Sequence, residues 1–197
     1  MTTSAANCMS GADELSFERI STWHPDFVAA IREHYTGSRA APPGKKMAWR
    51  ITDTVETIAW IGLGEPAYKL APRRRLGLKD ARPAALTVCC FIYRRVAAGI
   101  TKVRGGDLLS MWHGVASEAW SERYGWEPVH WESLVQASAV ESDVPGACFR
   151  SAGYRSLGLT TGRGARRPAG STHSARVWGN TEPKLVFYRG PLHRVAV

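Results

Sequence analysis

Apolar residues follow two different periods along this chain, one typical of helices and one typical of strands. A spacing of three to four residues predicts helices over residues 25–34, 108–124 and 145–152. Asp107 is the expected N-cap of the second helix. Gly125 is its expected end, because glycine accepts the left-handed backbone that often closes a helix.

Short runs rich in β-branched and aromatic residues predict six strands, at residues 46–51, 57–63, 86–93, 128–135, 154–159 and 184–188. The first two flank a polar turn and are expected to form a hairpin. The run 86–93 is the most apolar and is typical of a strand buried on both faces. The order of these elements predicts an α/β (α+β layered) domain with a mixed central sheet flanked by helices.

The chain of 197 residues suits a loose tail over residues 1–12 and a single domain over residues 13–197. Hydrophobic residues make up 44% and charged residues 22%, which excludes a disordered or fibrous protein. No apolar run is long enough to span a membrane, and no secretory leader is visible. The spacing of the four cysteines suggests neither zinc nor disulfides, so we expect reduced thiols in a cytoplasm.

The net charge of +9 is unevenly distributed. Residues 39–104 carry 14 basic and 4 acidic side chains, and residues 150–197 carry 9 and 1. The other segments are acidic. This pattern is typical of a phosphate-facing surface, and a merely basic, well-solvated surface would explain it equally well.

Two loops concentrate the basic residues, at about residues 66–82 and 160–176, and glycine and proline keep both out of helices. Arginine suits phosphate groups and base edges. The DNA-binding candidates are Arg39, Lys69, Arg73, Arg74, Arg75, Arg163, Arg166 and Arg167. Trp49 and Tyr68 are candidates for stacking on an unpaired base.

Three places in the sequence could carry chemistry. His34 and Tyr35 stand where a predicted helix runs into a glycine-containing loop, although a lone histidine is more often simply packed or solvated. His130 and Glu132 fall on one face of a predicted strand, where the carboxylate needs either an arginine partner or a functional role. Tyr154 precedes the second basic loop and could stack or act as a ligand.

Five motifs in order resemble the Mom family of bacteriophage adenine-modification proteins and the related A protein of Druantia antiphage systems. They are residues 34–39 (HYTGSR), 60–64 (WIGLG) leading to 68–73 (YKLAPR), 123–128 (RYGWEP) followed by Glu132, 146–158 (GACFRSAGYRSLG) and 162–164 (GRG). The resemblance covers about residues 30–192 and is specific at the level of the superfamily.

The resemblance implies a GNAT-like acyltransferase fold and conversion of adenine in double-stranded DNA to an N6-carbamoylmethyl derivative, which protects phage DNA from host restriction. It also implies iron, held by His34, Tyr35 and Glu132. An acyl-coenzyme A donor is not implied clearly, because residues 102–106 only approximate the pyrophosphate loop of GNAT enzymes. The location is then the cytoplasm of the host cell.

These observations combine into one hypothesis and two alternatives. In the hypothesis the basic loops hold the duplex, an adenine flips out, and His34, Tyr35, Glu132 and Tyr154 form the catalytic set. The first alternative is a DNA-binding or remodelling protein of a defence system or mobile element that modifies no base. The second is a GNAT acyltransferase that acts on a substrate other than DNA. The oligomeric state stays open.

Overall fold

The computed structural model of the chain describes residues 6–8, 15–34, 44–53, 56–66, 85–93, 103–140, 142–160 and 182–191. For residues 6–8, and for residues 85–93 apart from Phe91, the description covers the backbone alone. All structural statements below concern these residues. The two basic loops predicted at 66–82 and 160–176 therefore lie almost wholly outside them.

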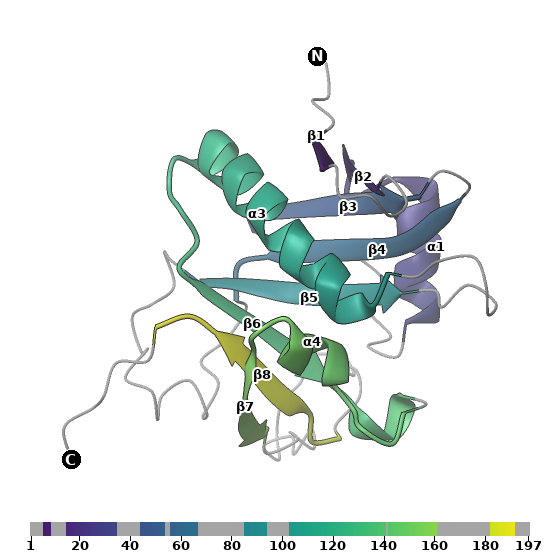
Figure 1. Cartoon of the computed structure of the whole chain (residues 1–197), viewed down its shortest axis with the longest axis vertical. Helices are drawn as coiled ribbons and strands as arrows, with labels where there is room; N and C mark the ends of the chain where they lie inside the picture. The colour runs from purple at the N-terminus through teal and green to yellow at the C-terminus, as the bar shows by residue number, and fades with distance from the viewer. Residues whose placement is uncertain are drawn as a thin grey trace, which may run out of the picture.

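Eight strands form one mixed sheet in the order β1-β2-β3-β4-β5-β6-β8-β7 (Figure 1). The strands are β1 (Ala6–Cys8), β2 (Leu15–Ile20), β3 (Lys46–Thr52), β4 (Thr57–Gly64), β5 (Ala85–Tyr93), β6 (His130–Val135), β7 (Arg155–Leu159) and β8 (Leu185–Arg189). Only β5 and β6 run parallel among the described pairs, over four residue pairs, and every other described pair is antiparallel.

Helices cover the two faces of the sheet (Figure 1). Helix α1 (Pro25–Glu33) packs on one face, and α3 (Gly105–Tyr124) and α4 (Ala147–Ser151) pack on the other. A single 3-10 turn, Ala137–Ala139, follows β6. We call the two sides the α1 face and the α3 face.

Side-chain alternation in the central strands assigns residues to the two faces. Trp49 of β3 contacts Trp112 of α3, with ring centroids 5.5 Å apart, so Trp49 belongs to the α3 face. Its neighbour Ala48 therefore points the other way, and it packs with Phe27 and Trp60 beneath α1. The larger core lies on the α3 face, where Trp112 and Trp120 are fully buried.

Glycines allow α4 to pack tightly. A Cβ atom at Gly106 would lie 2.4 Å from the Cβ of Ser151, so a side chain there would push α3 and α4 apart. Gly146, which precedes α4, has a left-handed backbone (φ 78°), and a Cβ there would lie 2.2 Å from the Phe187 ring. Close helix packing thus accounts for Gly106 without a phosphate ligand at the start of α3.

The mixed α/β architecture and the predicted order of elements are confirmed, including the β3–β4 hairpin. The expected N-cap Asp107 is wrong, because α3 begins at Gly105 with Arg104 as its cap residue. The sequence reading missed β1 and β2. In β2, Glu18 faces Arg50 of β3 and accepts a hydrogen bond from its Nε at 2.9 Å, so charged residues interrupt the apolar pattern that would mark a strand.

Candidate functional site

The end of α1 fixes the position of His34. After Glu33 the backbone turns to an extended conformation, and the His34 N–H donates to the carbonyl oxygens of Ala30 (3.1 Å) and Ile31 (3.2 Å). Burial and, to a smaller extent, the charge of Lys184 lower the pKa of His34 to about 4. His34 is therefore a neutral imidazole at pH 7.

Strand β6 presents His130 and Glu132 to the α1 face. Between them, Trp131 contacts the rings of Trp112 (5.7 Å) and His113 (4.8 Å) on α3, so its two neighbours point away from that helix. Both His130 and Glu132 are buried, with 7% and 5% exposure. The predicted shared face of these two residues is confirmed.

Strand β8 adds a tyrosine beside them. Tyr188 pairs with Glu132 across the strands, and burial together with the Glu132 charge raises the pKa of Tyr188 to about 12. Its hydroxyl donates to the carbonyl of Pro191 at 3.0 Å and contacts Nδ1 of His130. A phenol has one proton, so His130 Nδ1–H donates to the phenol oxygen and His130 Nε2 carries the lone pair.

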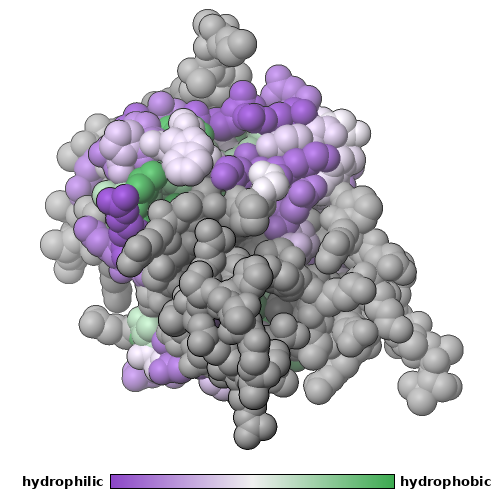
Figure 2. All heavy atoms as spheres, turned by 180° about the vertical axis from the view of Figure 1, so that it is seen from behind, coloured by the Kyte–Doolittle hydropathy of each residue, from purple (hydrophilic) through white to green (hydrophobic). Residues whose placement is uncertain are grey.

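We call His34, His130, Glu132, Lys184 and Tyr188 the α1-face cluster. Within it Tyr188 pairs with Glu132 and contacts His130, and the charge of Lys184, four positions before Tyr188, acts on His34. It combines proton acceptors, namely neutral imidazole and carboxylate, with proton donors, namely phenol and ammonium. Buried proton acceptors and proton donors on one face of a protein are typical of sites that carry out acid–base catalysis. Figure 2 shows the molecule from the side opposite to Figure 1, and the described residues on that surface are mainly hydrophilic.

A second polar network lies on the α3 face. Arg189 Nη1 donates to His113 Nδ1 at 2.5 Å, and His113 Nε2 lies 2.8 Å from the Tyr154 hydroxyl. Arginine has no acceptor, so Nδ1 accepts and Nε2–H donates to Tyr154. Burial, with a smaller contribution from Arg189, lowers the pKa of His113 to about 3, and burial raises the pKa of Tyr154.

Two of the predicted site residues are thereby corrected. Tyr154 is 3% exposed and bonds to α3, on the face opposite Glu132, so it does not join His34 and Glu132 in one pocket. Trp49 has no exposed surface and lies beneath Trp112, so its ring offers no face to a base. Both residues looked available in the sequence because an aromatic residue in a strand can face either side.

Most of the remaining predicted residues fall outside the described part of the chain. They are Tyr35, Arg39, Tyr68, Lys69, Arg73, Arg74, Arg75, Arg163, Arg166 and Arg167. The structure therefore describes His34 and Glu132 of the predicted metal ligands, and it places both on the α1 face.

The sequence reading missed Lys184 and Tyr188 as members of the site. Their only signal was membership of a predicted strand. Tyr188 meets Glu132 because β6 and β8 pair antiparallel with that register, and Lys184 stands at the start of β8 on the same side. Pairing of strands about fifty residues apart is not visible in local sequence patterns.

The two described ligand candidates suit iron only in part. A neutral His34 offers a nitrogen lone pair and Glu132 offers carboxylate oxygens, whereas the ammonium of Lys184 beside His34 disfavours a second cation there. Within the described ranges, no group of three or more His, Cys, Asp or Glu side chains could hold a metal ion. Iron stays a prediction that rests on the resemblance and on Tyr35.

Comparison with known proteins adds no family to this picture: no protein-family model matches the chain, and no curated protein matches it. None of the helices in the described segments has the length and apolar character needed to cross a membrane.

Proposed function

We propose that this protein is a DNA-modifying transferase of GNAT-like fold that converts adenine to its N6-carbamoylmethyl derivative and so protects phage DNA from restriction. The observation that carries the proposal is that His34, at the end of α1, and the buried Glu132 of β6 both lie on the α1 side of the sheet. The motifs that resemble the Mom family include both residues.

The topology supports the GNAT-like part of the proposal. Helix α3 connects β5 to the parallel strand β6, and antiparallel strands extend the sheet on both sides of that pair. The parallel pair is short, and a mixed sheet with helices on both faces is a layered scaffold able to support a site at its middle.

The proposed chemistry assigns a proton acceptor. A new carbon bond at the adenine N6 atom replaces an N–H bond, so one proton must leave the amine, and the bond between the transferred carbon and its leaving group in the donor breaks, with the electron pair going to the leaving group. Neutral His34 accepts the proton from N6. Since N6 is hydrogen-bonded within a duplex, the base first leaves the stack.

Iron enters this proposal through the resemblance alone. His34, Tyr35 and Glu132 would hold it, and a bound metal would polarise the donor fragment as a Lewis acid. The proton transfer above is assigned to His34 without a bound metal, because the nitrogen lone pair that accepts the proton is the one that a metal would use.

Mass spectrometry of nucleosides tests the proposal. DNA from cells that express the protein should contain a modified adenine, and His34→Ala should reduce it by about 100-fold or more, as expected when a general base is lost. His24→Ala is the matched control, because His24 stands at the other end of the same helix α1. DNA with only unmodified adenine in expressing cells contradicts the proposal.

A further inference from the structure

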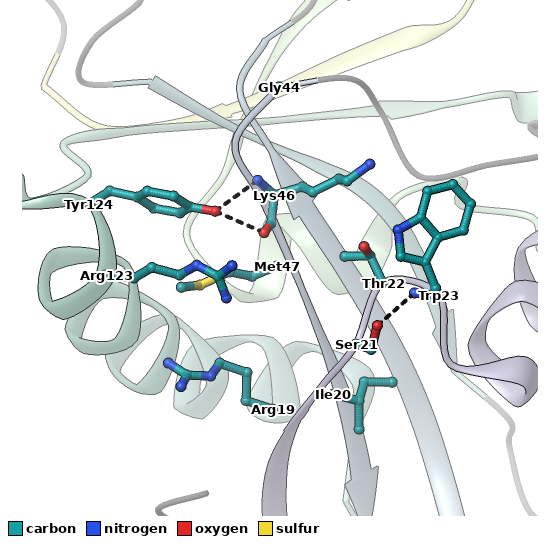
Figure 3. A pocket seen from close by; sticks show the side chains of 10 residues that line it. All are labelled: Arg19, Ile20, Ser21, Thr22, Trp23, Gly44, Lys46, Met47, Arg123 and Tyr124. Atoms are coloured by element: carbon teal, nitrogen blue, oxygen red, sulfur yellow. Dashed lines mark hydrogen bonds between the residues drawn. The ribbon is translucent and has the colours of Figure 1, made fainter. Parts of the chain in front are cut away.

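A pocket of about 500 Å³ lies away from the α1-face cluster, where the end of β2, the start of β3 and the end of α3 meet (Figure 3). Its walls are held together by Tyr124. The Tyr124 hydroxyl accepts from the Lys46 N–H at 3.2 Å and donates to the Lys46 carbonyl at 3.1 Å. This double hydrogen bond ties α3 to β3 and keeps the pocket walls in place.

Three cations line this pocket, each from a different element: Arg19 from β2, Lys46 from β3 and Arg123 from α3. No carboxylate is among the lining residues that the structure describes. Arg19 forms an ion pair with Glu122 at 3.7 Å, and the Glu122 side chain is 76% exposed, so it neutralises Arg19 only weakly. Glu65 also approaches the lining residue Gly44, which leaves the three cations in excess over the two nearby carboxylates. The pocket therefore carries an excess of positive charge.

An exposed tryptophan stands at the rim of this pocket. Trp23 is 66% exposed, whereas most tryptophans of the described core are fully covered. The backbone N–H of Trp23 donates to Ser21 Oγ at 3.1 Å, which fixes the turn, and Lys46 Nζ lies over the indole ring, 5.1 Å from its centre. The exposed indole is a flat surface beside fixed positive charge.

Positive charge and an exposed aromatic ring recognise different parts of a nucleotide. Arginine and lysine neutralise a phosphate, and an indole stacks on an unpaired base whatever its sequence. A carboxylate-rich peptide would use the three cations but would leave the indole without a role. The combination within one pocket therefore favours nucleic acid over a merely acidic partner.

We propose that this pocket binds a backbone phosphate of DNA through Arg19, Lys46 and Arg123, and that Trp23 stacks on an adjacent unpaired base. The inference rests on the proposed function in taking DNA as the substrate, and it deepens that function by assigning a DNA contact outside the predicted basic loops. The base left unpaired opposite an extruded adenine, or a short single strand, supplies the required unpaired base.

Salt-dependent binding tests the phosphate contact. The full-length protein is titrated with a fluorescent single-stranded DNA of ten nucleotides at several salt concentrations. Loss of one phosphate contact reduces the slope of log K against log salt by about 0.7 for single strands, so Arg123→Gln and Arg19→Gln should each reduce the slope by up to that amount, because they share one phosphate. Equal slopes in these variants and the wild type overturn the inference.

Arg104→Gln is the matched control for charge. Arg104 caps the start of the same helix α3 and is exposed. Arg104→Gln therefore removes one positive charge at the opposite end of α3 from Arg123, about 28 Å away at 1.5 Å per residue. Its slope should equal that of the wild type. An equal reduction in Arg104→Gln and Arg123→Gln shows that net charge alone acts, and contradicts the pocket.

Substitutions of Trp23 test the stacking contact. Trp23→Leu should weaken binding by about tenfold, and Trp23→Phe should retain most of it, because a smaller ring still stacks. Crosslinking of DNA that carries 5-bromodeoxyuridine to the wild-type protein should map to Trp23, which is independent of how any variant folds. Binding of a poly-glutamate peptide or of RNA alone, with no binding of DNA, overturns the inference.

The DNA-binding measurement tests the pocket, and the adenine-modification measurement tests the proposed function, so each can be contradicted without the other. Weakened binding in the pocket variants with no modified adenine in any DNA supports the pocket and contradicts the proposed function. Modified adenine together with unchanged DNA binding in the pocket variants contradicts the pocket and leaves the proposed function standing.

Discussion

The two faces of the sheet carry similar side chains in different surroundings. The α3 face holds His113, Tyr154 and Arg189, and the α1 face holds histidine, tyrosine and lysine together with Glu132. On the α3 face the three groups form one linear network among tryptophans. On the α1 face a carboxylate is added.

This difference distinguishes a structural network on the α3 face from a candidate functional site on the α1 face. On the α3 face, His113 uses both ring nitrogens for hydrogen bonds, one with Arg189 and one with Tyr154, so we assign it a structural role. The α1-face cluster contains a buried carboxylate, Glu132, beside a tyrosine whose pKa it raises. Substitutions on the two faces should therefore affect stability and activity in opposite proportions.

The largest stability effect is expected on the α3 face. His113→Ala leaves a cavity and removes the partners of Tyr154 and Arg189, so the free energy of unfolding should fall by about 3 kcal/mol. Urea unfolding followed by fluorescence measures it. A loss below about 1 kcal/mol would contradict a structural role for the network.

Close packing of α3 on α4 gives the next effect. Gly106→Ala places a Cβ atom 2.4 Å from Ser151 Cβ and should lower the free energy of unfolding by about 2 kcal/mol. Gly114→Ala in the same helix is the control, because a Cβ there meets nothing within 4 Å, and it should raise stability by about 0.5–1 kcal/mol. Equal changes in both variants would contradict a packing role for Gly106, because helix propensity alone favours alanine at both positions.

Acid should destabilise the protein through both faces. The pKa of His113 falls to about 3 and that of His34 to about 4 in the folded protein, below the usual 6.5. The unfolded chain then binds more protons, so the stabilisation present above about pH 6.5 is lost as pH falls towards these folded values.

The slope of the free energy of unfolding against pH distinguishes the two faces of the sheet. Buried His113 contributes up to about 1.4 kcal/mol per pH unit, and half-buried His34 contributes less because solvent screens it. The wild type and His113→Gln are unfolded by urea at a series of pH values between the folded and usual pKa values. A slope unchanged in His113→Gln would assign the effect to other groups.

The smallest stability effect is expected in the α1-face cluster. Glu132→Gln keeps the shape of the side chain and removes its charge, so stability should change by less than about 1 kcal/mol while any modified adenine falls sharply. Nucleoside mass spectrometry and urea unfolding on the same variant give both readings. A loss of stability as large as that of His113→Ala would make Glu132 a structural residue.

Local patterns predicted much of the fold and less of the site. Apolar runs located β3, β4, β5 and β6, and alternation in β6 placed His130 and Glu132 together. Which face of the sheet each helix covers depends on tertiary packing. For that reason Tyr154 and Trp49 were assigned to a pocket from which α3 separates them.

The basic pocket was equally hidden from the sequence. Arg19, Lys46 and Arg123 are separated by 27 and 77 positions, and none lies in the predicted basic loops. They meet because β2 pairs with β3 and the Tyr124 hydroxyl binds the Lys46 backbone. Counting charge along the sequence therefore shows which segments are basic. Only the folded structure shows which basic residues lie together on one surface.

The short parallel pair of β5 and β6 has a consequence for folding. It spans Ala85–Val88 and His130–Ser133, and it joins an antiparallel half made of β1–β5 to one made of β6, β8 and β7. The β3–β4 hairpin can form from neighbouring residues, whereas the joint must first close the intervening chain that contains α3, which costs loop entropy. We therefore expect the amides of this joint to be protected later in refolding than those of the β3–β4 hairpin, with α3 deciding when the two halves become one sheet.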